Sequence, residues 1–234
     1  AITGSVAEPF GEDIWLLDGD RVRMFGIPFE TRTCLVRLNS GLLWVHSPVA
    51  LTPERLKAVT SLGAVGFIIA PNKIHSLEIV PWRSAFPEAQ VWVSPRFHER
   101  HQEIASDGVL TDAAPKIWAD DIQQQVFHGH RFLDEVVFLH VKSRTLIVTD
   151  LIQKHDPARE HAPWRWLKKW AGILGEKGGS ACDLRASTAD RDAARAARDK
   201  ILSWDFDTLV ISHGLCLRSG AKAEVERALA WLDR

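Results

Sequence analysis

Four apolar segments of this chain end on a histidine, an asparagine or an aspartate, and this pattern limits the folds available to it. The segments are LLWVH (42–46), GFIIAPN (66–72), TLIVTD (145–150) and TLVISH (208–213). Such runs of apolar and β-branched residues are typical of strands in sheets that are covered on both faces. Because the carboxyl end of a strand lies at the rim of a sheet, where sites form, four such endings predict one shared pocket.

Capping and turn signals predict helices and hairpins between these strands. Thr52 is placed to cap a helix that starts at Pro53 and stops at Gly63, and Gly41 closes a hairpin of strands 33–38 and 42–46. Further helices are expected at 164–174, 188–204 and 221–234 and from Ser94 onward, further strands at 14–19, 90–94, 124–130, 134–140 and 145–150, and a flexible connection at 176–183. Hairpins beside strand–helix steps predict an α/β fold with mixed sheets.

The composition excludes several classes of protein. The chain has 234 residues, of which 46% are hydrophobic and 25% charged, which suits a single domain over residues 1–234. A formal net charge of −1 argues against a nucleic-acid partner. There is no apolar run of about 18 residues and no basic, then apolar leader, so we expect no membrane partner and no signal peptide. The odd, widely spaced Cys34, Cys182 and Cys216 fit a reducing cytoplasm.

The residues that end the strands are of the types that bind a divalent metal. Imidazole and carboxylate are usual ligands of zinc, and iron or manganese would also suit them. A metal with an open position polarises substrates and activates water. The alternative is structural: a strand-end histidine often packs in the core, and Asp150 could cap a turn or pair with an arginine.

The order of these motifs resembles the metallo-β-lactamase fold superfamily. The resemblance rests on LLWVHSP, FIIAPNKIHSLEI, GHRFLDEVVF, TLIVTDL and VISHG, and within the superfamily it points to a bacterial branch of unknown function. It implies a four-layer αββα sandwich of two mixed β-sheets with the metal site at their shared edge.

Carried over residue by residue, the family's metal loop is degenerate. Its last histidine falls on His75, but Ile74 stands at its aspartate, Asn72 at its second histidine and Ala70 at its first. The later ligands match better: His130 follows Gly129, Asp150 stands at the bridging aspartate, and His213 is the final histidine. The resemblance thus implies one divalent metal on His75, Asp150 and His213, with His130 as a further ligand and Asp150 as the catalytic carboxylate.

Four more residues are candidates for supporting the site. His46 stands where the family often has an aspartate beside the ligands, and Asn72 could complete the coordination. Trp82 could form a pocket wall and His140 could face the site, although a place in the core is the alternative for each. Two functions stay open: a mononuclear metal-dependent hydrolase of a small molecule, or an inactive scaffold that binds a small molecule or a protein.

Overall fold

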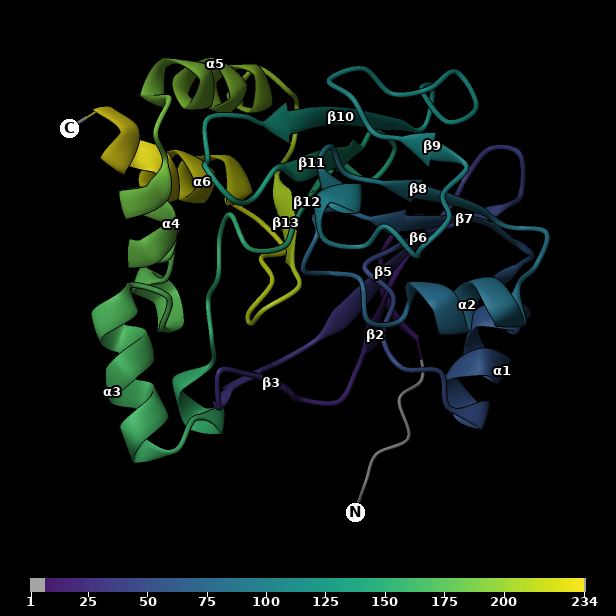
Figure 1. Ribbon diagram of the computed structural model, residues 1–234, viewed down its shortest axis with the longest axis horizontal. Coiled ribbons are helices and arrows are strands. Elements are labelled where there is room, and N and C mark those ends of the chain that lie inside the picture. The colour runs from purple at the N-terminus through teal and green to yellow at the C-terminus, as the bar shows by residue number, and fades with distance from the viewer. Residues whose placement is uncertain (1–6, 234) are drawn as a thin grey trace.

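The computed structural model describes residues 7–233, in which two β-sheets lie between two groups of helices (Figure 1). The larger sheet has the order β1-β2-β5-β6-β7-β8-β9 and the smaller one the order β10-β11-β12-β13. Strands β6 to β9 are parallel and the rest of the larger sheet is antiparallel, while only β12 and β13 are parallel in the smaller sheet. Both sheets are therefore mixed, which confirms the predicted class.

The larger sheet consists of β1 (Glu8–Gly11), β2 (Ile14–Asp18), β5 (Arg32–Arg37), β6 (Leu43–His46), β7 (Val65–Ala70), β8 (Gln90–Val93) and β9 (Gly108–Val109). The smaller sheet consists of β10 (Ile122–Phe127), β11 (Glu135–His140), β12 (Thr145–Val148) and β13 (Thr208–Ile211), and β3 (Val22–Met24) and β4 (Ile27–Phe29) form a separate hairpin. The helices are α1 (Pro53–Leu62), α2 (Ile79–Ala85), α3 (Ala162–Ala171), α4 (Cys182–Ser187), α5 (Arg191–Leu202) and α6 (Ala221–Leu229).

Three apolar clusters divide these elements into four layers. One cluster joins the facing sides of the sheets, with Trp44 and Phe67 from the larger sheet against Phe138 and Ile147 from the smaller one. A second lies between the larger sheet and α1 and α2, and a third between the smaller sheet and α4, α5 and α6. The αββα order implied by the family resemblance is therefore confirmed.

The capping signals located some helices accurately and others poorly. Thr52 accepts a hydrogen bond from the Arg55 amide and α1 ends before Gly63, as predicted. The helix predicted from Ser94 was wrong, because Arg96 adopts a left-handed conformation (φ 60°) and only a 3₁₀ turn, Phe97–Glu99, follows it.

The segment before α5 also differs from the prediction. The region 176–183, expected to be a flexible connection, contains the start of α4. The cap of α5 is Asp190, whose side chain accepts from the Ala193 amide, and the hydroxyl of Thr188 instead donates to the Leu184 carbonyl. Within residues 7–233, no helix has both the length and the apolar character needed to cross a membrane.

Candidate metal centre

Parallel pairing of β12 and β13 brings two of the predicted ligands together. Val148 pairs with Ile211 at the ends of these strands, so Asp150 and His213 each lie two residues beyond a matched pair. His75 comes from the other sheet, in the loop that follows β7. One ligand atom of each of these three residues lies within 4.8 Å of the others, at the edge where the two sheets meet.

The three side chains form a compact and mostly buried cluster. The Nε2 atoms of His75 and His213 are 3.1 Å apart. Asp150 Oδ2 is 3.1 Å from His75 Nε2, and Asp150 Oδ1 is 3.3 Å from His213 Nε2. The side chains of His75, Asp150 and His213 are only 11%, 9% and 7% exposed, so little of this centre is accessible to solvent.

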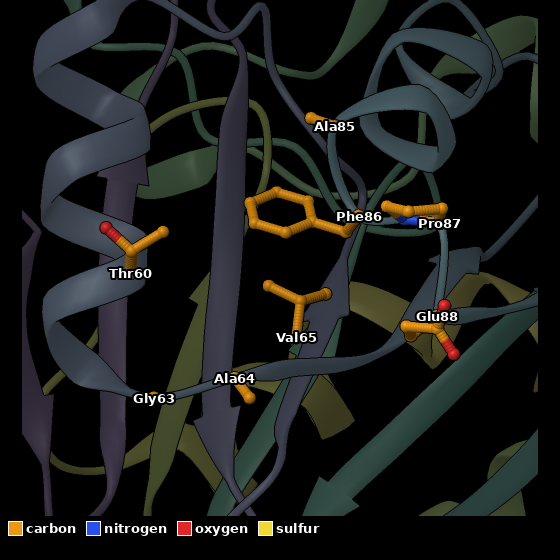
Figure 2. A pocket seen from close by; sticks show the side chains of 8 residues that line it. All are labelled: Thr60, Gly63, Ala64, Val65, Ala85, Phe86, Pro87 and Glu88. Atoms are coloured by element: carbon orange, nitrogen blue, oxygen red, sulfur yellow. The ribbon is translucent and has the colours of Figure 1, made fainter.

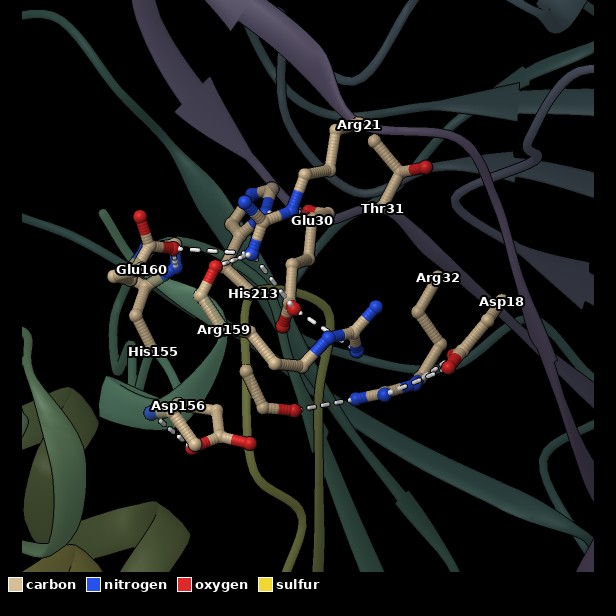
Figure 3. Close-up of polar contacts among 12 residues, drawn as sticks. Asp18, Arg21, Glu30, Thr31, Arg32, His155, Asp156, Arg159, Glu160 and His213 are labelled. Carbon is tan, nitrogen blue, oxygen red and sulfur yellow. Dashed lines mark hydrogen bonds and ion pairs between the residues drawn. The ribbon is translucent and has the colours of Figure 1, made fainter. Parts of the chain in front are cut away.

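The backbone around the centre fixes which nitrogen of His213 is free. Its Nδ1 is 2.6 Å from the carbonyl oxygen of Glu30, which can only accept, so Nδ1 carries a proton (Figure 3). In the neutral ring the Nε2 lone pair then points at His75 and Asp150. A lone pair that faces a carboxylate and a second imidazole at these distances is repulsive unless a proton or a cation lies between them.

The spacing of these atoms suits a metal ion. A tetrahedral zinc ion with bonds of about 2.0–2.1 Å separates its ligand atoms by about 3.4 Å. The two imidazole nitrogens are 3.1 Å apart, and each has a different oxygen of Asp150 at 3.1 or 3.3 Å. One ligand atom from each of the three residues lies within 4.8 Å of the others. The donor set of two nitrogens and one carboxylate oxygen is also one that zinc, iron and manganese accept.

Without a metal, the charges of the cluster stabilise one another. Burial alone would lower the pKa of His213, but the hydrogen bond and charge of Asp150 outweigh it and raise that pKa above its usual value. Burial alone would raise the pKa of Asp150, and the two histidines instead hold it well below its usual value. The centre therefore keeps an anionic carboxylate and attracts a positive charge.

Asn72 supports the carboxylate and leaves no group free for coordination. Its side-chain amide donates to Asp150 Oδ2 at 2.8 Å and to Thr149 Oγ1 at 3.0 Å. Its carbonyl oxygen accepts from the backbone amides of Ile74 and His75. Asn72 thus positions two ligands and is not itself a ligand in this arrangement.

Two supporting residues had not been identified from the sequence. Ser47 Oγ is 2.6 Å from His75 Nδ1, on the side of the ring away from the centre. Glu135 is buried, and its carboxylate accepts from the backbone amides of Thr149, Asp150 and Leu151 at 2.7–2.8 Å. An acidic residue at the start of the otherwise apolar strand EVVFLH was the available signal for Glu135, while Ser47 directly follows His46 at the end of β6.

His46 lies in the core between the sheets. Its ring stacks on Trp44 at 5.7 Å and meets Phe138 edge-on at 5.5 Å. Neither ring nitrogen has a hydrogen-bond partner in the described part of the chain, and burial, aided by His75, lowers the pKa of His46 to about 3. The residue is a neutral aromatic ring beside the centre and outside the ligand cluster.

The structure does not bring His130 into the centre. Its Nδ1 accepts from the amides of Phe132 and Leu133, and its Nε2 is 2.7 Å from Ser187 Oγ. Both ring nitrogens are therefore engaged by the protein. Burial also lowers the pKa of His130 below its usual value, so the ring holds its loop in the neutral form.

His140 and Trp82 also lie away from the centre. Because β11 and β12 are antiparallel, His140 pairs with Thr145 at the start of β12, at the opposite end from Asp150. There His140 Nδ1 is 2.7 Å from Ser143 Oγ. Trp82 is buried under the outer face of the larger sheet and donates to the Val49 carbonyl, so the core interpretation holds for both residues.

The apolar hollow drawn in Figure 2 lies at the wrong edge of the sheet to serve this centre. Its volume is about 500 Å³ and its lining includes Val65 and Phe86. Val65 begins β7, whereas His75 follows the end of the same strand. A substrate at the centre would therefore have to reach side chains that are at most 11% exposed.

Fold and centre together define a chain with the metallo-β-lactamase fold in which the loop after β7 keeps only His75 of the residues expected at the family's metal ligands. Residues 11–160 match DUF4336, described as a domain of unknown function, and the chain belongs to that family. A search of curated proteins by sequence found no match.

Solved structures share the fold at low sequence identity. A metallo-β-lactamase from Pontibacter korlensis is 13% identical with a TM-score of 0.67, over 98% of this chain and 99% of that one. A metallo-β-lactamase from Erythrobacter litoralis is 14% identical with a TM-score of 0.62, over 100% and 94%. The metal-soaked Flv1 flavodiiron core from Synechocystis sp. PCC6803 is 11% identical with a TM-score of 0.64, over 98% of this chain and 62% of that one. At this identity the likeness establishes the fold and no activity.

Proposed function

We propose that the protein is a hydrolase with a single divalent metal, zinc, held by His75, Asp150 and His213. The observation that supports this most directly is the pair of imidazole nitrogens 3.1 Å apart, with the two oxygens of the Asp150 carboxylate 3.1 and 3.3 Å from them. The Nδ1 atoms of the two histidines, on the far side of each ring, are hydrogen-bonded to other residues, as is usual for metal-binding histidines. A metal in such a site polarises a substrate oxygen and makes a nucleophile from water at neutral pH.

The residues of the chain would divide the remaining work. His75 and His213 supply neutral nitrogens, and Ser47 and the Glu30 carbonyl fix how their rings point. Asp150 supplies the negative charge that offsets part of the metal's charge. As the carboxylate of the centre, it would also orient a polar substrate or accept a proton from it.

The centre supports one ion and not two. Among residues 7–233, His75, Asp150 and His213 are the one group of three or more such side chains close enough to share a metal. Ile74, at the position of the family's loop aspartate, packs against the apolar cluster of the smaller sheet. The chain therefore lacks the carboxylate that would orient water in a two-metal centre.

Metal content provides the test. Protein purified without chelator should contain close to one equivalent of zinc, iron or manganese per chain. The variant His213→Ala should lose it, while His161→Ala, a change at an exposed histidine on the surface, should keep it. Wild-type protein that binds none of the three metals, even when they are added, would rule out the proposal.

The low exposure of the three side chains favours a second function, a scaffold that binds a small molecule without turnover. All three ligand side chains are at most 11% exposed, and the hollow in Figure 2 lies at the other edge of the sheet. A panel of lactones, thioesters and phosphodiesters separates the two. Metal-dependent turnover of any of them, lost in His213→Ala, supports the hydrolase, and metal binding without turnover supports the scaffold.

A further inference from the structure

A lysine is buried close to the candidate metal centre, although removing a charged ammonium group from water is unfavourable. Lys168 lies on the inner side of α3 and its side chain is 1% exposed. Its ammonium group meets three acceptors: the Pro28 carbonyl at 2.6 Å, Glu160 Oε1 at 2.8 Å and His155 Nδ1 at 3.2 Å. All three protons of the ammonium are therefore used. A buried charge that is so fully paired is costly to assemble, so its position calls for an explanation.

His155 connects this lysine to the centre. Its ring is completely buried and stacks on that of His213, with centroids 6.3 Å apart and an interplanar angle of 19°. Figure 3 shows His155 and Glu160 beside His213. The other ring nitrogen, Nε2, is 3.1 Å from Gln153 Oε1. The amide nitrogen of Gln153 in turn lies 3.4 Å from Asp150 Oδ1, a long hydrogen bond.

The donor and acceptor of each hydrogen bond between Lys168, His155, Gln153 and Asp150 can be assigned from the two end residues, Lys168 and Asp150. Asp150 is anionic and can only accept, so the amide group of Gln153 must donate to it, which turns Gln153 Oε1 toward His155. That oxygen can only accept, so His155 carries its proton on Nε2 and has a lone pair on Nδ1. The Pro28 carbonyl and Glu160 accept two of the protons of Lys168. The lone pair of His155 can therefore accept from Lys168 only if the lysine keeps its third proton. One arrangement of protons satisfies all four residues.

We propose that Lys168 acts through His155 and Gln153 as a positioning residue for Asp150. The line of hydrogen bonds holds Oδ1 toward His213 and carries the polarising effect of a buried cation to the carboxylate. Oδ2 is held separately by Asn72. As far as it concerns metal affinity, this inference rests on the proposed function, since Asp150 is there a metal ligand. The arrangement of protons does not depend on it.

The proton positions can be measured in metal-free protein. Long-range ¹⁵N–¹H NMR of the imidazoles distinguishes the two neutral tautomers. We expect His155 to carry its proton on Nε2 in the wild type at neutral pH. In Lys168→Met the acceptor role of Nδ1 is lost, and a mixture of tautomers should appear. The control is Lys154→Met, which removes another buried lysine, one that pairs with Glu224 and the Glu176 carbonyl outside this line.

Metal affinity is the second readout. Changes to groups that orient metal ligands typically cost 10–100-fold in affinity. We expect zinc to bind about tenfold more weakly in Lys168→Met than in Lys154→Met, measured by competition with a chelating dye. Gln153→Met, which cuts the line nearer the centre, should show a similar loss and serves if Lys168→Met does not fold. The double variant should lose little more than either single one, because both changes break the same line.

The possible results separate this inference from the proposed function. A wild-type His155 with its proton on Nδ1 would overturn the inference, as would equal zinc affinities in Lys168→Met and Lys154→Met or fully additive losses in the double variant. If wild-type protein binds no zinc, the proposed function fails. The tautomers of His155 in the wild type and in Lys168→Met then still decide whether the line of hydrogen bonds exists.

Discussion

Replacing Asp150 by asparagine should change how the stability of the metal-free protein depends on pH. The substitution keeps the shape of the side chain and removes the charge that raises the pKa of His213. A histidine with a raised pKa in the folded state stabilises the protein fully below its unfolded pKa of about 6.5, and this contribution disappears as pH rises through the folded pKa. The wild type should therefore lose stability between pH 6 and pH 9, and Asp150→Asn should lose less.

Glu135 also makes the metal-free protein less stable as pH rises. Burial, and then the charge of Asp150, raise its pKa to about 7 in the folded protein. A carboxyl group with a raised pKa contributes its stability at low pH and loses it as pH rises through about 7. Without the charge at position 150 this effect is smaller. The depressed pKa of Asp150 itself matters only in acid, because that contribution is lost only as pH falls through the folded pKa.

The size of the effect follows from the distance between the charges. An imidazolium and a carboxylate 3.3 Å apart attract by about 5 kcal/mol at an effective dielectric constant of about 20. Desolvation of the two buried groups offsets most of this. We expect a net difference of about 1–2 kcal/mol between the pH 6 to pH 9 losses of the wild type and the variant.

Urea unfolding in the presence of a chelator measures this difference, followed by the fluorescence of the ten tryptophans. His161→Gln, a change at an exposed histidine, is the matched control and should run parallel to the wild type. Parallel pH profiles for the wild type and Asp150→Asn would refute the electrostatic coupling inferred here. Added zinc should flatten the wild-type profile, because the metal takes the place of the proton.

Three further substitutions test the groups around the ligands. Ser47→Ala removes the partner of His75 Nδ1 and should weaken zinc binding about tenfold with little change in melting temperature, as measured by chelator competition and calorimetry. Glu135→Gln leaves a donor facing backbone amides, so it should cost about 1–3 kcal/mol in urea unfolding, and an unchanged midpoint would contradict the importance of those bonds. His46→Phe replaces an imidazole without hydrogen-bond partners by an apolar ring and should raise the free energy of unfolding by about 1 kcal/mol with zinc affinity unchanged, whereas a loss of zinc would make His46 part of the centre.

Much of the fold could be predicted because its signals are local. The apolar runs, the cap at Thr52 and the hairpin glycine Gly41 each act within a few residues, and the corresponding elements formed almost where expected. The helix predicted from Ser94 failed because a local pattern competes with backbone geometry. Arg96 has no sequence signal for its left-handed conformation, and Ser94 before it looked like an ordinary helix cap.

Strand direction separates the candidate residues that meet from those that do not. Asp150 and His213 end parallel neighbours, so one sheet edge holds both. His140 ends a strand that is antiparallel to the strand of Asp150, and the short turn at 141–144 already placed it at the opposite end. Strand ends are thus informative only when the direction of each strand is taken into account. The alternation along β6 likewise put His46 on the side of Trp44, in the core.

The support behind the ligands could not be predicted, because much of it belongs to the backbone. The Glu30 carbonyl fixes the tautomer of His213 and lies 183 positions away in the chain, and any residue at position 30 would offer the same group. The amides that Glu135 binds are equally independent of the residues that carry them. His75 comes from the larger sheet, and Asp150 and His213 from the smaller one. The centre can therefore form only after the two sheets have packed, and a metal that binds there stabilises that packing as well as the loops that carry its ligands.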